Sequence, residues 1–515
     1  MTPAFSLSTF RSSLRTAGRP LSTAANRFRL PPTIRQILSS SQVDEKVAVT
    51  GWVKSIRKQK RIAFGVLSDG SSAIGLQAVF NEELGDRVKE ITNGTSVRVL
   101  GNIVKSPGSG QDKELHVQEV EILGACDPET YPIQKKALTP EYLRENTHLR
   151  ARTDAIAAMV RLRGLLMRGL DRYFEDQGFA YAHTPVLTSG DAEGGGEAFR
   201  IASIPPSPDH VGKDGPPETE AEREFFAHPA YLTVSHQLHL EALSSALNRV
   251  YTLSPCFRAE RGVTRRHLAE FWMLEAEWGV APAENPRAQT AALCDFLEGV
   301  IKGVVGDPGI IGGEDVNVLW RHREHDYVPE ADREKRREAM VRAVTTDSPW
   351  PKISYSDAVR ELLKSNQAWT FPVSWGSALQ SEHEKWLSET LVGGPLFVTD
   401  YPAGIKPFYM RANPPAPAAE EVTVGCFDLL MPHVGELAGG SVREERVGVL
   451  EASMHSKGMD MNGERYGWYG DLRRFGGAPH VGFGMGFERL VGWVGGIENV
   501  RECLPMPRWA GRMLL

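Results

Sequence analysis

Long apolar runs, paired cysteines and an excess of basic residues are all missing from this chain of 515 residues. No apolar run approaches the roughly 18 residues that a membrane-spanning helix needs, so we expect no membrane attachment. The five cysteines form no CxxC pair, which argues against a structural zinc site and a disulfide framework and favours a reducing compartment. The net charge of −6 excludes a generally basic nucleic-acid binder, so any such surface must be a local patch.

Acidic residues are missing from the first 43 positions, and the first acid in the chain is Asp44. Arginines are spread there among serines, threonines and alanines, a composition typical of a mitochondrial or plastid transit peptide. We therefore predict a mitochondrial transit peptide over about residues 1–28 and a location in the mitochondrial matrix. The alternative is an ordinary disordered basic tail.

Residues 46–125 have the pattern of a small closed β-barrel. Five short alternating runs are separated by turn signals such as Asp69-Gly70 and Asn93-Gly94. Between the first two runs lies a basic stretch, which we interpret as a loop beside the ring of Phe64. Five-stranded barrels bind single-stranded nucleic acid by stacking bases on aromatic rings beside a basic groove. The predicted contacts are Arg57, Lys58, Lys60 and Phe64; the alternative is a solvated turn.

The remainder of the chain indicates an α+β catalytic domain. Residues 126–150 are rich in proline and polar residues and are interpreted as a hinge, and the catalytic domain then spans 151–515. A long helix is predicted over about 153–177, followed by a strand over 179–187. Residues 203–224 are rich in Pro, Gly and acids and are predicted to be a disordered insertion. The helix stripe comprises Ile156, Met159, Val160, Leu162, Leu165, Leu166, Leu170 and Phe174.

A pair of alternating runs around a polar turn, 256–260 and 267–277, predicts a hairpin on a sheet floor. Arg258 in the first run is suited to hold a phosphate or carboxylate by a forked contact. The alternative is a surface hairpin with solvated salt bridges. Near the end of the chain, residues 482–490 place glycines on a strand that leads into a helix with Arg489 in its first turn. Such glycines allow a ligand to approach the backbone closely.

Together these motifs resemble the class II aminoacyl-tRNA synthetases, and within them the asparaginyl branch. The long helix with Gly178 to Pro185 resembles the family's first motif, which builds a dimer interface. Residues 257–271 resemble the second motif and 484–489 the third, while the barrel resembles the anticodon-binding OB-fold domain. The resemblance implies an antiparallel sheet flanked by helices, a homodimer, and ATP-dependent ligation of asparagine to tRNA(Asn).

The resemblance also implies roles for individual residues in binding ATP and Mg²⁺. Arg258 would bridge the α-phosphate and the amino-acid carboxylate, and Glu260 would accept from the adenine amino group. Phe271 and Arg489 would sandwich the adenine, and Arg258 and Arg489 are the residues assigned to catalysis. Arg266 and His267 would hold the β- and γ-phosphates. Asp428 and Glu436 match the magnesium-binding acids, and Mg²⁺ prefers such oxygen ligands.

The choice between asparagine and aspartate depends on a few positions, because the aspartyl branch shares this scaffold. Glu193 and Gln237 match residues that hold the α-ammonium, and Arg443 matches one that meets the side-chain carbonyl. Aspartyl enzymes place a lysine where this chain has Leu240, and an aspartate where it has Glu275. An acid facing the pocket without that lysine repels a carboxylate and accepts from an amide, so asparagine is favoured.

Several alternatives remain open at this level. One is aspartate–tRNA ligation, with or without strict discrimination, and another is a synthetase-like RNA-binding protein that has lost catalysis. A synthetase-related asparagine synthetase would be expected to lack the barrel. Arg443 could instead pair with Glu444 or Glu445 on an exposed turn, and His480 is interpreted as structural.

Overall fold

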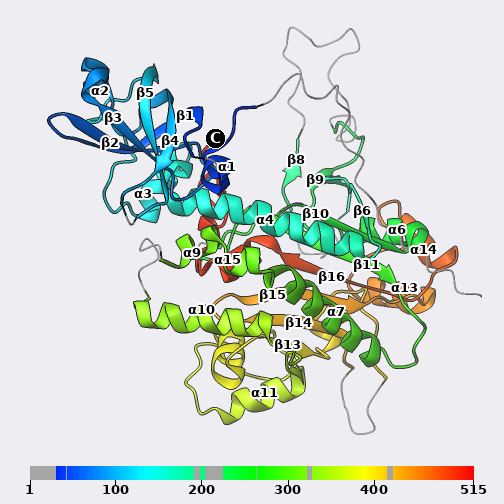
Figure 1. Ribbon diagram of the computed structural model, residues 1–515. Helices are drawn as coiled ribbons and strands as arrows, with labels where there is room; N and C mark the ends of the chain where they lie inside the picture. Colours follow the sequence, from blue (N-terminus) through cyan, green and yellow to red (C-terminus); the bar gives the residue numbers. More distant parts are fainter. Residues whose placement is uncertain are drawn as a thin grey trace, which may run out of the picture. The chain divides into compact units, whose positions relative to one another are not determined.

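The computed structural model describes residues 30–41, 43–108, 110–190, 198–202, 224–262, 264–321, 328–414 and 422–515. The chain divides into two compact units, Met1–Tyr131 and Pro132–Leu515 (Figure 1). Glu193, the predicted transit peptide and nearly all of the insertion 203–224 lie outside the described residues. Within the described residues, no helix has both the length and the apolar character required to span a bilayer.

The first unit is a closed five-stranded barrel with strand order β1-β2-β3-β5-β4, which confirms the predicted OB-type fold. Alternate residues of each strand point inward, and Val49, Val53 and Leu67 are fully buried there. A capped helix, α1 (Ile34–Ser39), adds Ile34 and Ile37 to the same core. The other elements are β1 (Lys46–Lys58), β2 (Ile62–Ser68), β3 (Leu76–Asn81), α2 (Asp86–Glu90), β4 (Ser96–Lys105) and β5 (Lys113–Gly124).

The second unit is built on an eight-stranded sheet with order β12-β13-β14-β15-β16-β11-β10-β6. The strands from β13 to β10 pair antiparallel, as expected, but both edge strands pair parallel, so the sheet is mixed. Three short strands form a separate sheet with order β7-β9-β8. The strands are β6 (Ala180–Tyr181), β7 (Leu187–Thr188), β8 (Arg200–Ile201), β9 (Ala230–Leu232), β10 (Arg249–Phe257), β11 (Glu270–Gly279), β12 (Lys352–Ser354), β13 (Leu396–Thr399), β14 (Cys426–Met431), β15 (Gly435–Val442) and β16 (His480–Gly486).

Helices α4 and α7 pack on one face of this sheet and share its main hydrophobic core (Figure 1). The predicted apolar stripe of α4 is buried except at Leu165, which is partly buried, and Val160, which is 40% exposed. The helix ends at Asp176, two residues before Gly178, whose φ of 75° lies in the left-handed region. The helices are α3 (Pro140–Glu145), α4 (Asp154–Asp176), α6 (Gln237–Leu247), α7 (Arg287–Val305), α8 (Pro308–Ile311), α9 (Glu314–Arg321), α10 (Glu330–Thr345), α11 (Tyr355–Lys364), α12 (Ser381–Lys385), α13 (Val447–Ser456), α14 (Gly467–Arg474) and α15 (Phe487–Gly495).

The strand predicted over 179–187 is wrong in extent. Within this run, only the residues of β6 and the first residue of β7 are paired as strands, and Pro185 lies between them. Proline cannot donate to a ladder, so the run breaks into two short pieces that join different sheets.

The two faces of the large sheet have opposite characters because side chains alternate along each strand. On β16, Val481, Phe483 and Met485 point into the core beneath the helices. The intervening Gly482, Gly484 and Gly486 therefore lie on the other face and leave it without side chains. This bare strip positions the candidate site.

Candidate active site

The predicted hairpin is present as β10 and β11, paired from Arg249↔Trp278 to Phe257↔Glu270. Its predicted bounds are wrong at the turn, because β10 ends before Arg258 and residues 258–260 and 267–269 lie in the connection between the two strands. It is not a surface feature, because β11 also pairs with β16 in the middle of the sheet. Across four strands, Glu275 lies opposite Gly484, Gly484 opposite Gly439, and Gly439 opposite Asp428. Direct partners point to the same face. Two acids are thus separated by two glycines, and the gap between them forms the floor of the site.

A cavity of about 150 Å³ lies on this face. It is lined by residues from the second-motif hairpin, from β15 and from the start of α15. Six of the residues predicted to bind ATP are among them: Arg258, Glu260, Arg266, Phe271, Glu436 and Arg489. The seventh, His267, lies beside Glu260, with its Nε2 3.2 Å from Glu260 Oε2.

The contacts within the cavity bring arginines together with an aromatic ring and acids. The Arg258 guanidinium lies 5.4 Å from the centre of the Phe271 ring, and its Nη1 is 3.9 Å from Glu260 Oε1. Arg489 donates to the backbone carbonyl of Glu436, which fixes its orientation. Neighbouring Glu488 is buried and accepts from the backbone N of Trp272 at 2.9 Å, so α15 is anchored directly to β11.

The two predicted metal-binding acids converge over Gly439. A Cβ at that position would lie 3.3 Å from Asp428 Oδ1 and 3.5 Å from Glu436 Oε1, so glycine keeps the space between them open. Burial raises the pKa of the Asp428 carboxyl, and the negative charge of Glu436 acts in the same direction, against the lowering effect of Lys406. Lys406 Nζ donates to both oxygens of Asp428 at 2.8 and 2.7 Å. The sequence patterns did not identify Lys406.

A third acid, Glu384 on α12, approaches the same group and also was not predicted. Its Oε2 lies 3.4 Å from Arg266 Nη1, and the same nitrogen donates to Ser381 Oγ at 2.8 Å. Burial together with Glu436 raises the pKa of Glu384 to about 7, against the lowering effects of Arg266 and Arg489. Helix α12 thus holds one of the predicted phosphate-binding arginines.

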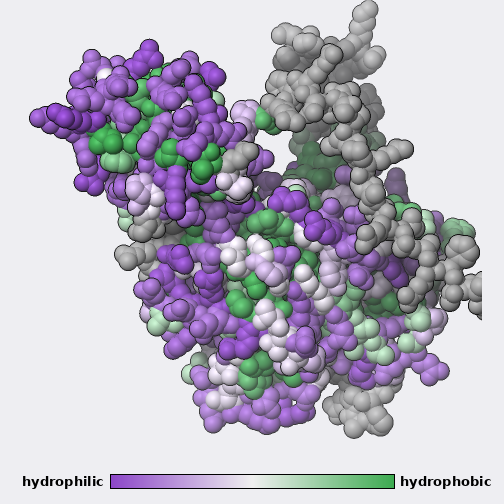
Figure 2. Space-filling view, in the orientation of Figure 1, coloured by the Kyte–Doolittle hydropathy of each residue, from purple (hydrophilic) through white to green (hydrophobic). Residues whose placement is uncertain are grey.

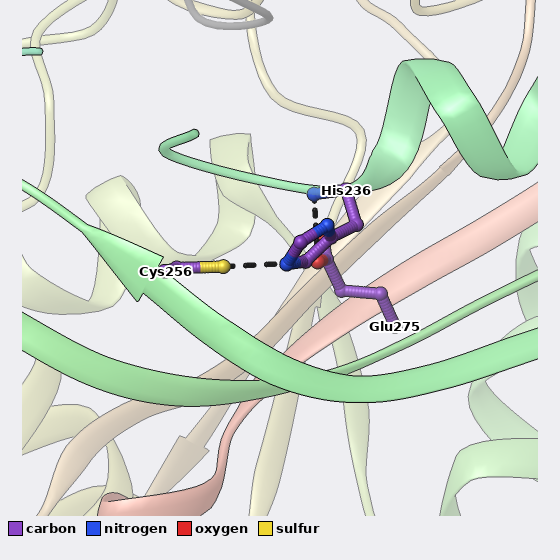
Figure 3. Close-up of side chains that lie close together, drawn as sticks. All are labelled: His236, Cys256 and Glu275. Atoms are coloured by element: carbon purple, nitrogen blue, oxygen red, sulfur yellow. Dashed lines mark hydrogen bonds between the residues drawn. The ribbon is translucent and has the colours of Figure 1, made fainter. Parts of the chain in front are cut away.

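Glu275 is buried, and its position is set by a hydrogen-bonded network. Its Oε1 accepts from Ser235 Oγ at 2.5 Å, and its Oε2 accepts from the backbone N of His236 at 2.8 Å. Figure 3 shows Glu275 with two of its neighbours, His236 and Cys256. Cys256 Sγ lies 4.0 Å from Glu275 Oε2. Since a carboxylate can accept about four hydrogen bonds, Glu275 retains capacity for a substrate amide.

His236, Cys256 and Glu275 also lie close enough together to be considered as metal ligands. Both ring nitrogens of His236 already have protein partners, however. Nδ1 lies 2.8 Å from Thr184 Oγ1, and Nε2 lies 3.1 Å from the carbonyl of Pro255. We therefore interpret the three as the network that orients Glu275.

Arg443 is buried, and its partner is Glu277. Its Nε lies 3.1 Å and 3.3 Å from the two oxygens of that carboxylate, and Nη2 donates to it as well. Nη1 donates to Ser441 Oγ at 2.7 Å. The alternative of an exposed pair with Glu444 or Glu445 is wrong, because these acids pair with Arg446 and Arg411. Burial disfavours the charge, but Glu277 more than compensates, so the pKa of Arg443 is raised above its ordinary value.

Glu277 was missed, although it stands two residues after Glu275 on the same strand and must share its face. Gly482, directly opposite on β16, provides the room: a Cβ there would overlap the Glu277 carboxylate. At this glycine, the group that approaches the backbone is therefore a protein carboxylate rather than a ligand.

Two family models match the chain. One, described as tRNA synthetases class II (D, K and N), matches residues 139–510. The other, described as an OB-fold nucleic acid binding domain, matches residues 47–123. This protein belongs to the class II tRNA synthetases of the D, K and N group.

Curated relatives of this synthetase extend over nearly its whole length. A protein from Desulfotalea psychrophila, named asparagine–tRNA ligase, is 40% identical over 93% of this chain and 98% of its own. Another of the same name, from Xanthomonas euvesicatoria, is 42% identical over 90% of this chain and 95% of its own. Among solved structures, the asparaginyl-tRNA synthetase of Pyrococcus horikoshii complexed with asparaginyl-adenylate matches with a TM-score of 0.76 and 27% identity, covering 94% of this chain and all of that one.

In this synthetase, Leu240 is fully buried and packs with Ala182 and Val250. No charge is therefore available at the position that distinguishes the aspartyl branch. Gln237, one helical turn earlier on α6, is also buried and donates through Nε2 to Glu241 Oε1 at 3.0 Å. Glu241 accepts from Tyr469 and Arg473, and His480 Nε2 lies 3.0 Å from it. His480 thus contacts the same buried acid as Gln237.

The OB-fold unit carries the residues predicted to contact tRNA on its outer surface. Arg57 and Lys58 were predicted to lie in a loop, but they lie at the end of β1. Arg57 is there directly opposite Phe64 on β2. The strand is longer than its apolar run, and its ladder with β2 continues to Lys58 beyond a bulge between Val53 and Ser55. Lys60 lies in the exposed turn that follows. A partly exposed ring therefore lies beside a basic strand end.

Proposed function

We propose that this synthetase is an asparagine–tRNA ligase that acts in mitochondria. It would activate asparagine with ATP to asparaginyl-adenylate and transfer the amino acid to tRNA(Asn). The curated relatives that cover over nine-tenths of the chain at about 40% identity carry the name of that activity. Two solved relatives were determined with asparaginyl-adenylate, the second from Entamoeba histolytica with a TM-score of 0.74 and 25% identity, covering 92% of this chain and 98% of its own.

The observation that carries the choice of asparagine is the charge of the buried pocket. Arg443, the group suited to hold a side-chain carboxylate, is already neutralised by Glu277. Glu275 adds a further buried acid, and Leu240 supplies no cation. A substrate carboxylate would meet uncompensated negative charge, whereas an amide can accept from Arg443 and donate to Glu275.

The chemistry of activation is positioning and charge neutralisation. The asparagine carboxylate is itself the nucleophile, so no general base is required. Arg258 would hold the α-phosphate against that carboxylate, Phe271 and Arg489 would enclose the adenine, and Arg266 would hold the distal phosphates. Asp428 and Glu436 converge as Mg²⁺ ligands would, and a bound Mg²⁺ would neutralise triphosphate charge.

The mitochondrial location rests on residues 1–28, which are rich in arginine and contain no acid. We expect a chain that lacks these residues to retain activity and to stay in the cytosol. Imaging of a tagged chain with and without residues 1–28 tests this. Import of the truncated chain would show that the signal lies elsewhere.

A homodimer is supported by the exposed apolar side chains of α4, which include Val160 and Met167 at 40% and 46% exposure. Figure 2 shows apolar side chains gathered on the face along which α4 runs. Such residues on a long helix are suited to a self-complementary interface. Light scattering after size exclusion measures the mass, and a monomer at micromolar concentration would contradict the proposal.

The deciding experiment is ATP–pyrophosphate exchange by the purified protein with asparagine or aspartate as substrate. We expect exchange with asparagine and little with aspartate, and loss of exchange in Arg258→Ala with the fold intact by circular dichroism. Exchange with aspartate alone would overturn the proposal. Binding of tRNA without exchange with either amino acid would instead favour an RNA-binding protein without catalysis.

A further inference from the structure

Glu241 is a buried acid that neither the motifs nor the activation chemistry uses. It lies on α6, four residues after Gln237, and its side chain has no exposed surface. Its carboxylate receives contacts from four residues: Gln237 on its own helix, Tyr469 and Arg473 on α14, and His480 on β16. A buried carboxylate with this many partners is strongly held in one position.

The contact with Gln237 has a definite chemical direction. An ionised carboxylate only accepts hydrogen bonds, so the amide group of Gln237 must present its NH₂ to Glu241. The 3.0 Å contact from Nε2 to Oε1 has this arrangement. The amide carbonyl is then left to accept from another donor. A carbonyl acceptor is what an α-ammonium group requires, and Gln237 is the residue expected to bind that group.

Glu241 is also linked to Arg443. His480 Nε2 lies 3.0 Å from Glu241 Oε2, while the carbonyl of His480 accepts from the backbone N of Arg443 at 3.0 Å. Arg473 donates both to Glu241 and to the carbonyl of Glu444, next to Arg443. Burial would raise the pKa of Glu241, but Arg473, His480 and Arg443 lower it well below its ordinary value. Glu241 is therefore ionised.

Glu241 adds a further buried carboxylate to those around Arg443. Glu277 pairs with Arg443 and Glu241 with Arg473, while Glu275 is a third buried acid. The negative charge of Glu241 raises the pKa of Arg443, in the same direction as that of Glu277. The carboxylate of Glu241 thus adds to the negative charge that Glu275 and Glu277 present to aspartate.

We propose that Glu241 is a positioning and specificity residue of this synthetase. It orients the Gln237 amide toward the substrate ammonium and makes the pocket repel a side-chain carboxylate. The inference rests on the proposed function, because it assigns the residue a role in selecting asparagine.

Three variants separate orientation from charge. Glu241→Gln removes the charge but keeps a carbonyl that can accept from Gln237, whereas Glu241→Met removes both. Tyr469→Phe keeps the charge and removes one partner. Glu298→Gln is the matched control, because Glu298 is a buried acid in α7 paired with Lys302 at 2.7 Å, away from the pocket.

The experiment measures exchange kinetics for asparagine, aspartate and ATP with the full-length chain, together with thermal unfolding. In Glu241→Gln we expect the preference for asparagine over aspartate to fall at least about tenfold, with KM for ATP unchanged. In Glu241→Met we expect KM for asparagine to rise about tenfold as well. Tyr469→Phe and Glu298→Gln should keep the native preference.

The outcomes that overturn the inference are specific. A native preference in Glu241→Gln, in a protein that itself prefers asparagine, overturns the inference alone, whether or not Glu241→Met folds. Equal rises in KM for ATP and asparagine would show a merely structural role and also overturn it. A native protein that prefers aspartate overturns the proposed function instead.

Discussion

Gly482→Ala tests whether the fold of β16 controls the substrate pocket. The added Cβ would overlap the carboxylate of Glu277, which must then withdraw from its forked contact with Arg443. Crowding of this kind costs about 1–3 kcal/mol, and full loss of one partner of a buried pair costs about 3–5 kcal/mol. Because Glu277 is displaced rather than removed, we expect a loss of about 3 kcal/mol in the free energy of unfolding.

The same substitution should weaken the activation of asparagine. An Arg443 that loses its fixed orientation forfeits a charged hydrogen bond to the substrate, worth about 1.5–3 kcal/mol. This corresponds to a fall of about 10- to 150-fold in kcat/KM for asparagine. Pyrophosphate exchange at several asparagine concentrations gives this value, and thermal or denaturant unfolding gives the stability.

Gly448→Ala is the matched control. Gly448 lies in α13 with open space around the position of a Cβ, so alanine there should be neutral or stabilise the helix by up to about 1 kcal/mol. If Gly482→Ala showed native stability and a native kcat/KM for asparagine, the assignment of Glu277 as the partner that orients Arg443 would be wrong.

Three further predictions concern separate parts of the molecule. Glu275→Ala should lower the preference for asparagine over aspartate in the exchange assay, since the remaining pocket has less negative charge; unchanged discrimination would refute its role. Phe64→Ala should leave exchange intact but weaken tRNA binding by about 1–3 kcal/mol, the value of one base stacked on an aromatic ring; filter binding measures this, and native affinity would place the tRNA contact elsewhere. Glu384 has its pKa raised from 4.5 to about 7, so the folded protein keeps a proton that the unfolded chain has already released. Stability should therefore fall as pH rises from about 4.5 to about 7, by up to about 3 kcal/mol, and Glu384→Gln should lack that part of the slope in thermal unfolding against pH; parallel curves for both proteins would contradict it.

Local patterns predicted the elements of both units well where one periodicity dominated. The barrel strands and α4 follow from strict alternation and from an apolar stripe, each with glycine or turn signals at the ends. The run 179–187 failed because its apolar residues do not show which sheet each piece joins. Arg57 and Lys58 were placed in a loop because the basic residues end the apolar alternation, although β1 continues through both of them.

The candidate site divides in the same way. Arg258, Glu260, Arg266, Phe271, Glu436 and Arg489 were predicted from motifs and lie around one cavity. Glu277 and Glu241 could have been found from the sequence. Glu277 stands two residues after Glu275 on one strand, and Glu241 stands four residues after Gln237 on one helix. Lys406 and Glu384 carried none, because their partners Asp428 and Arg266 are distant in sequence and meet them only when the sheet and α12 come together.

The amino-acid sequence by itself determined the class of the protein and the kinds of groups that handle ATP, because motif residues on one hairpin and one strand-to-helix turn are close in the chain. Only the tertiary structure decided which charged partners those groups have and how deeply they are buried. Whether Arg443 is free to bind a carboxylate depends on Glu277, 166 residues away, and on a glycine opposite it that leaves room for the pair. Electrostatic selection depends on distances and burial in three dimensions, and the spacing of residues along the chain does not specify these.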